Sequence, residues 1–161
     1  MVELIPVCES NIKLYEMFER DYDNHLKRYL SRIYPRNHEQ YADRIKHNLL
    51  FWNYIFVNQN NIGSVWLEKE TPGDSSASLG IFINDESNQG KGIGVYVIKR
   101  CIKIGSALLD VKKVELRVRA TNLRAYNCYK KCGFHETNSF VKERNPKVIQ
   151  MEISVNENGT K

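Results

Sequence analysis

The sequence lacks any apolar run close to the roughly 20 residues that a membrane-spanning helix needs. Its first residues contain no basic stretch followed by an apolar one, so we expect no signal peptide. Cysteine is scarce, and the four residues of this type show no tight framework spacing: Cys8, Cys101, Cys128 and Cys132. These absences argue against a membrane protein and against a disulfide-stabilised secreted domain. We therefore expect a cytoplasmic protein with free thiols and no membrane partner.

The composition that is present is typical of one globular domain. A chain of 161 residues, 42% hydrophobic and 27% charged, fits a single core and excludes a disordered or fibrous protein. The 24 Lys and Arg residues outnumber the 19 Asp and Glu residues, which gives a net charge of +5. The basic residues are spread along the chain, so we expect no nucleic-acid partner. We expect one domain over residues 1–155 and a frayed tail over residues 156–161.

Hydrophobic periodicity and turn residues predict the order of helices and strands. In the first half the predicted elements are a strand over 3–7, a helix capped by Ser10, a helix over 41–52, a hairpin of strands over 54–57 and 62–68, and a strand over 78–83. In the second half they are a helix over 94–109 with Val97, Cys101, Ile104 and Leu108 on its apolar face, a strand over 114–118, a helix over 122–132 ended by Gly133, and strands from Phe134 onward and over 148–155. The predicted fold class is α+β, with a mixed, mostly antiparallel central sheet and helices on both faces.

A glycine-rich segment, Gln89-Gly90-Lys91-Gly92-Ile93-Gly94, lies between a predicted strand and a predicted helix. This arrangement aims backbone N–H groups and a helix dipole at an anion, and glycine lets a phosphate approach the backbone closely. The segment is not a P-loop, because the required Gly-Lys-Ser/Thr is absent, and it is not a dinucleotide fingerprint, because residue 95 is Val. By itself it favours phosphate binding modestly, and a tight helix entry is the alternative.

A second segment, Asn122-Leu-Arg-Ala125-Tyr-Asn-Cys-Tyr129-Lys-Lys-Cys-Gly133-Phe134, follows on the next predicted helix. Together with the pattern Gln89-x-x-Gly92-x-Gly94 it resembles the GNAT acetyltransferase superfamily, and the resemblance is firm from Leu79 to Phe134. It implies acetyl-CoA as cosubstrate and direct attack on the thioester by a primary amine, either a peptide N-terminus or a small-molecule amine. We expect a monomer or homodimer.

The resemblance also implies roles for individual residues. The implied acetyl-CoA-binding residues are Ile81, Phe82, Ile83, Gln89, Gly90, Lys91, Gly92, Ile93, Gly94, Val95, Asn122 and Ala125. Tyr129 is implied as the general acid that protonates the departing thiolate. Plainer alternatives stay open: a solvated loop lysine for Lys91, a helix cap for Asn122 and a core aromatic for Tyr129.

The general base is not assigned from the sequence. Relatives that act on the N-terminus of a ribosomal protein carry a Glu five residues before the Asn of the second segment, and that position is Arg117 here. The alternatives are Glu68, Glu70, Glu115 or a chain of water molecules. Glu115 shares the polar face of its strand with Arg117 and Arg119, so a role as an ion-pair partner stays open for it. A non-catalytic sensor of CoA or acetyl-CoA, which would use the same glycine loop, is the competing function, because the Glu of those relatives is missing here.

Two smaller patterns bear on ligands. Cys128, Cys132 and His135 lack an evident fourth metal ligand, so we expect buried thiols and no metal. In this family the acceptor is shaped by the first two helices and the loop between the last strands, here residues 22–41 and 136–146. Tyr29, Tyr34 and Tyr41 either line an aromatic cleft there or simply pack, and the basic residues Lys27, Arg28, Arg32 and Arg36 hint at an acidic acceptor.

Overall fold

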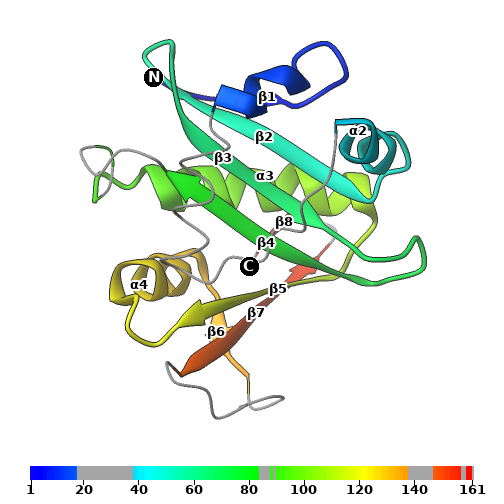
Figure 1. Cartoon of the computed structure of the whole chain (residues 1–161). Coiled ribbons are helices and arrows are strands. Elements are labelled where there is room, and N and C mark those ends of the chain that lie inside the picture. The colour runs from blue at the N-terminus through cyan, green and yellow to red at the C-terminus, as the bar shows by residue number, and fades with distance from the viewer. Residues whose placement is uncertain (18–37, 84–87, 89, 138–146, 157–158, 161) are drawn as a thin grey trace.

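The structure is a computed structural model that describes residues 1–17, 38–83, 88, 90–137, 147–156 and 159–160 (Figure 1). Its strands are β1 (Val2–Pro6), β2 (Leu50–Val57), β3 (Asn60–Glu68), β4 (Ser76–Ile83), β5 (Lys113–Arg119), β6 (His135–Glu136), β7 (Val148–Asn156) and β8 (Gly159–Thr160). Its helices are the 3₁₀ helix η1 (Ile12–Met17) and the α-helices α2 (His38–Lys46), α3 (Ile93–Leu109) and α4 (Leu123–Cys132). None of the helices in these ranges is long and apolar enough to cross a lipid bilayer.

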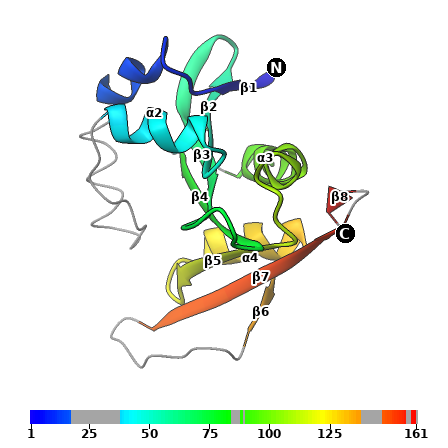
Figure 2. The same ribbon diagram turned by 90° about the vertical axis from the view of Figure 1, so that its right-hand side faces the viewer.

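The strands form one mixed sheet in the order β1-β2-β3-β4-β5-β7-β6, and β8 pairs with β7. Neighbouring strands run antiparallel except β4 and β5, which are parallel. Helix α3 lies against one face of the sheet, and η1 and α2 lie against the other (Figure 2). The predicted α+β class, with helices on both faces of a mostly antiparallel sheet, is confirmed.

Strand β2 is buried on both faces, as a strand between two layers of helices requires. Phe51 and Ile55 belong to the larger hydrophobic cluster, beneath α3. Trp52 and Tyr54 belong to the smaller cluster, which also contains residues of η1 and α2. A Cβ atom at Gly105 of α3 would lie 2.6 Å from the Phe51 ring, so this helix approaches β2 too closely for a larger residue.

A buried lysine joins the end of β3 to the C-terminal end of α3. Lys69 is only 7% exposed, and its Nζ donates hydrogen bonds to the carbonyl oxygens of Leu109 at 2.5 Å and Pro72 at 3.1 Å. A positive charge at this end complements the helix dipole and supplies a donor to a carbonyl without an intrahelical partner. The contact therefore holds α3 against the turn between β3 and β4.

The substitution Lys69→Met is expected to lower the free energy of unfolding by about 1.5–3 kcal/mol, the usual contribution of a hydrogen bond to a charged group. Methionine keeps most of the apolar stem but leaves the buried Leu109 carbonyl without this donor. Urea denaturation followed by circular dichroism measures the loss. Lys103→Met, at an exposed position of α3, is the control and should change stability by less than about 0.5 kcal/mol. Equal stability of the two variants would contradict the bridging role of Lys69.

The predicted helix over residues 41–52 is confirmed up to Lys46 and wrong beyond it. Helix α2 ends at Lys46, and Asn48 adopts a left-handed conformation with φ of 54°, after which Leu50 begins β2. The N–H of Leu49 donates to the carbonyl of Arg44, which closes the helix end. Ile45, Leu49 and Trp52 do recur at helical spacing, but the β-prone residues from Leu50 onward gain more by pairing in the sheet.

Three smaller expectations also differ from the structure. The described part of the first predicted helix, Ile12–Met17, is a 3₁₀ helix. The side chain next to its start that bonds the backbone is Asn11 rather than Ser10: it accepts from the N–H of Cys8 and donates to the carbonyl of Pro6. The outer side of α3 carries Ile104 and Leu108, which are 42% and 50% exposed, because the buried face turns toward Ile98, Ile102 and Leu109 instead. In the predicted tail, Gly159–Thr160 pairs with the end of β7.

Candidate functional site

The parallel strands β4 and β5 pair at one end and then separate (Figure 1). Both strands are described over their whole length, and their register contains three pairs, from Ser76 with Lys113 to Ser78 with Glu115. Beyond these pairs β4 stays bound to β3, and β5 stays bound to β7. Over Leu79–Ile83, β4 therefore has no register with β5, and an extended ligand can lie along this edge.

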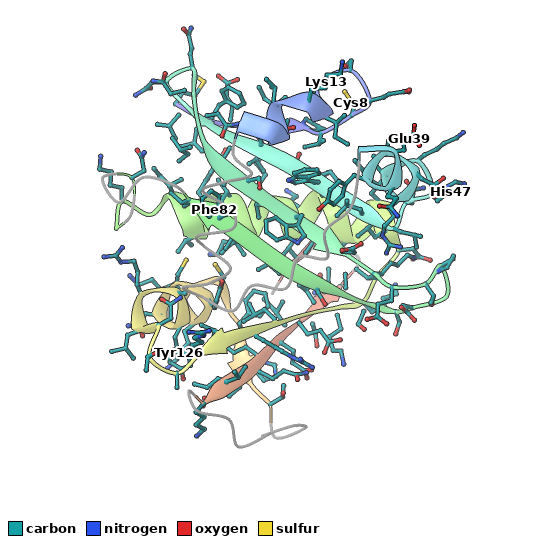
Figure 3. All side chains as sticks on the ribbon, viewed as in Figure 1. Cys8, Lys13, Glu39, His47, Phe82 and Tyr126 are labelled. Carbon is teal, nitrogen blue, oxygen red and sulfur yellow. The ribbon has the colours of Figure 1, made fainter. Side chains whose placement is uncertain are left out.

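The sequence-predicted residues of β4 lie on this stretch, beyond the last pair with β5. Ile81 and Ile83 are half-buried and pack against the cluster under α3, whereas Phe82 is buried. Figure 3 shows Phe82 near the end of β4 and Tyr126 on α4, on opposite sides of the separation between the two strands. The backbone of this stretch, rather than its side chains, is thus the part that is offered to a ligand.

The glycine loop lies beside the separated strands, at the N-terminus of α3. Gly90 and Gly92 have φ of 76° and 79°, and a Cβ atom at either would meet no other atom within 4 Å. Gly92 is the N-cap of α3, and no side chain caps this helix. The first intrahelical bond is from the N–H of Tyr96 to the carbonyl of Gly92, so the N–H groups of the first turn have no helical acceptor. Open space, left-handed glycines and N–H groups without a helical acceptor are together the features of an anion-binding helix N-terminus.

Three further predicted residues of the loop can be located. Ile93 is buried in the core, where it anchors the first turn of α3, and Val95 packs against the same core. Lys91 is exposed, so its charge is available at the loop surface. Gln89 lies outside the described residues.

Helix α4 packs closely against the first turn of α3. A Cβ atom at Gly94 would lie 3.1 Å from the sulfur of Cys128, so only a very small residue fits between the two helices. Asn122 is the N-cap of α4, and its Oδ1 accepts a hydrogen bond from the N–H of Ala125 at 3.3 Å. The capping role is thereby confirmed. No hydrogen bond to another described residue uses the Asn122 amide nitrogen, which leaves that donor for a ligand.

Tyr129 lies on α4 and is half-buried. Its ring packs edge-on against Phe134, with centroids 6.0 Å apart and planes at 63°. Its hydroxyl makes no hydrogen bond to another residue in the described part of the chain. Burial raises the pKa of this hydroxyl above its ordinary value, and the neighbouring thiols of Cys128 and Cys132 raise it further. The phenol is therefore protonated at neutral pH, which is the state that a general acid requires.

The three carboxylates that the sequence left open as bases have different surroundings. Glu68 is held by Arg44 of α2, whose Nε lies 2.5 Å from its Oε2. Glu70 is exposed after β3. Glu115 accepts a hydrogen bond from the Gln150 amide at 3.1 Å. Arg117, at the position where relatives carry a Glu, is exposed.

The four cysteines are free thiols, as predicted. Cys128 and Cys132 hydrogen-bond to each other, and this contact lowers the pKa of Cys128 and raises that of Cys132. His135 lies 3.8 Å from Glu152. Among the described residues no three metal-ligating side chains gather in one place.

Two aromatic residues on the α2 face of the sheet bear on the acceptor side. The sequence leaves Tyr41 open as a cleft or packing residue and does not indicate Trp66. Tyr41 is buried and packs on Trp52, with centroids 5.1 Å apart, so it is a packing residue. Trp66 of β3 is paired with Gly80 of β4, and a Cβ atom at Gly80 would lie 2.1 Å from the indole. This ring therefore covers β4 on the α2 face. The other proposed acceptor residues, Tyr29, Tyr34, Lys27, Arg28, Arg32 and Arg36, lie outside the described residues.

Comparisons with known proteins agree with this geometry. The family model described as acetyltransferase (GNAT) domain matches residues 2–135. A spermidine N-acetyltransferase from Vibrio cholerae, solved in complex with CoA and spermine, is 23% identical over 95% of each chain, with a TM-score of 0.74. A dodecameric structure of spermidine N-acetyltransferase from the same organism, in an intermediate state, is 24% identical over 95% of this chain and 93% of that chain, with a TM-score of 0.71. No curated protein sequence matches the chain.

Proposed function

The chain belongs to the GNAT acetyltransferase family, and from this premise we propose that it transfers the acetyl group of acetyl-CoA to a primary amine. The acceptor class is a peptide N-terminus or a small-molecule amine. The observation that supports the proposal best is the separation of β4 and β5 beside the uncapped, glycine-lined N-terminus of α3. An extended ligand with a pyrophosphate at one end fits both features at once.

The residues present fit acetyl-CoA along its length. The N–H groups from Gly92 to Val95 bind the pyrophosphate, because they point outward and have no competing cap. The backbone of β4 over Ile81–Ile83, which lies beyond the register with β5, binds the pantetheine amides as an added strand would. The amide nitrogen of Asn122 donates to the same arm from the side of α4. Bound in this way, acetyl-CoA supplies an activated acyl group on a thiolate leaving group.

Tyr129 completes the reaction at the sulfur end. As the acetyl carbon forms its bond to the amine, the carbon–sulfur bond breaks and negative charge develops on sulfur. The protonated phenol gives its proton to this sulfur, because burial and the nearby thiols hold it in the neutral form. The mechanism is therefore direct attack, with no acyl-enzyme intermediate.

Titration of the chain with acetyl-CoA, followed by thiol release in the presence of amines, tests the proposed function. The panel contains spermidine and spermine, because the similar structures are of spermidine N-acetyltransferases and one of them is a complex with spermine. It also contains an aminoglycoside, lysine and short peptides with free N-termini. We expect saturable acetyl-CoA binding and thiol release with at least one amine. Binding without release for the whole panel would support the sensor, and no binding would exclude both functions.

A further inference from the structure

A row of polar side chains crosses the sheet on the face that α2 covers. The register pairs Glu68 of β3 with Ser78 of β4, Ser78 with Glu115 of β5, Glu115 with Glu152 of β7, and Glu152 with His135 of β6. Residues paired in register point to the same face of a sheet, and strands are spaced by about 4.8 Å. Arg44 of α2 reaches Glu68, so the row lies on the α2 face.

The carboxylates of this row differ in how their charges are balanced. Glu68 pairs with Arg44, and Glu152 lies 3.5 Å from Lys113 and 3.8 Å from His135. Glu115 is hydrogen-bonded to the neutral amide of Gln150 and makes no ion pair within the described part of the chain. Its carboxylate is therefore fixed in direction while its charge stays available to a cation from outside the chain.

The position of Glu115 coincides with the point where β4 and β5 begin to separate. The pair of Ser78 and Glu115 is the last one in the parallel register. Ser78 is exposed and small, so the space above β4 beside Glu115 is not filled by a side chain of that strand. Two residues further along β4, the indole of Trp66 covers Gly80 and bounds this space. An amine that approaches the separated strands from the α2 face thus meets Glu115.

We infer that Glu115 binds the ammonium group of the acceptor and accepts its proton, an inference that rests on the proposed acetyl transfer. The acceptor enters as R–NH₃⁺, and one proton passes to the Glu115 carboxylate and then to solvent. The free amine forms the carbon–nitrogen bond and loses its second proton, while the carbon–sulfur bond breaks and sulfur gains the proton of Tyr129. The second proton released by the amine then reprotonates the tyrosine. Overall, one proton leaves the site for each acetyl group transferred.

The substitution Glu115→Gln is expected to reduce kcat/KM about 10²-fold, measured with the amine of the panel that gives the highest turnover. This value is the lower end of the roughly 10²–10⁴-fold contribution of a positioned base. Acetyl-CoA affinity, measured by calorimetry, should stay within threefold, because the residue lies on the acceptor side. Glu3→Gln, at an exposed position of the edge strand β1, is the control and should keep full activity.

Two further variants separate a role in charge from a role in structure. Glutamine at position 115 keeps a hydrogen-bonding partner for Gln150, whereas aspartate keeps the charge on a shorter side chain. The inference therefore expects Glu115→Asp to be more active than Glu115→Gln, and a structural role expects the reverse. Glu68→Gln should lose less activity than Glu115→Gln, because Arg44 already holds that carboxylate.

The outcomes distinguish this inference from the proposed function. A wild-type chain that turns over, with Glu115→Gln within threefold of it, would overturn the role of Glu115 and leave the acetyl transfer standing. A larger loss in Glu68→Gln than in Glu115→Gln would also overturn the inference. A wild-type chain without turnover on any amine of the panel would overturn the proposed function and this inference together.

Discussion

Replacement of Gly92 by valine is expected to weaken acetyl-CoA binding by at least 10²-fold, about 2.8 kcal/mol. Gly92 has φ of 79° at the N-cap of α3, where a β-branched residue is strained. The variant either keeps this conformation and places its side chain where the pyrophosphate approaches, or leaves it and turns the N–H groups away. Both outcomes remove several charge-assisted hydrogen bonds at once. Isothermal titration with acetyl-CoA measures the loss.

The fold itself should survive this substitution. A Cβ atom at Gly92 meets no protein atom within 4 Å, so the cost is confined to the backbone conformation, about 1–2 kcal/mol. Gly73→Val is the matched control, because that glycine also has open space around it and its φ is not positive. A Gly92→Val chain that melts normally and binds acetyl-CoA as tightly as Gly73→Val would show that the pyrophosphate binds elsewhere.

The parts of the candidate site that depend on local signals were predictable from the sequence. Asn122 caps α4 and Gly133 ends it with φ of 104°. Both positions are predictable from residue type alone, because an Asn side chain can accept from a helix N–H and glycine tolerates the left-handed conformation. The glycine loop is also local, because left-handed residues at Gly90 and Gly92 are what that composition favours. The role of Tyr129 came from the resemblance of its surroundings to a family and stays a prediction.

The rest depends on pairing between distant segments, which periodicity does not encode. Beyond Ser78 and Glu115 the two strands stay with other partners, β4 with β3 and β5 with β7, and β7 follows much later in the chain. The neighbourhood of Glu115 and Ser78, and the ion pair of Glu68 with Arg44, exist only once that register is formed. For the same reason the predicted helix overlaps the start of β2, because Leu49 and Trp52 continue the helical spacing of Ile45 and the sheet partner of β2 is not visible in the local pattern.

Tyr129 is placed so that its hydroxyl can be tested almost separately from its ring. The ring packs against Phe134 and the cluster under α3, and phenylalanine would preserve both contacts. The hydroxyl has no hydrogen-bond partner among the described residues, so its removal leaves no described group unsatisfied. Because the pKa of this hydroxyl is raised, the phenol stays protonated above the ordinary tyrosine pKa of about 10. Loss of this proton should therefore cause no decline in activity at any pH up to about 10.

The substitution Tyr129→Phe is therefore expected to lower turnover by roughly 10²–10⁴, or about 3–5 kcal/mol of transition-state stabilisation, with acetyl-CoA affinity and melting temperature nearly unchanged. CoA thiolate is already a fair leaving group, so the lower end is expected. Tyr126→Phe is the matched control, because this half-buried tyrosine on the same helix keeps its ring contact with Lys130 when the hydroxyl is removed. Turnover of Tyr129→Phe equal to that of Tyr126→Phe would leave Tyr129 as a packing residue and assign protonation of the thiolate to water, because both variants would then have lost only a hydroxyl that takes no part in the reaction.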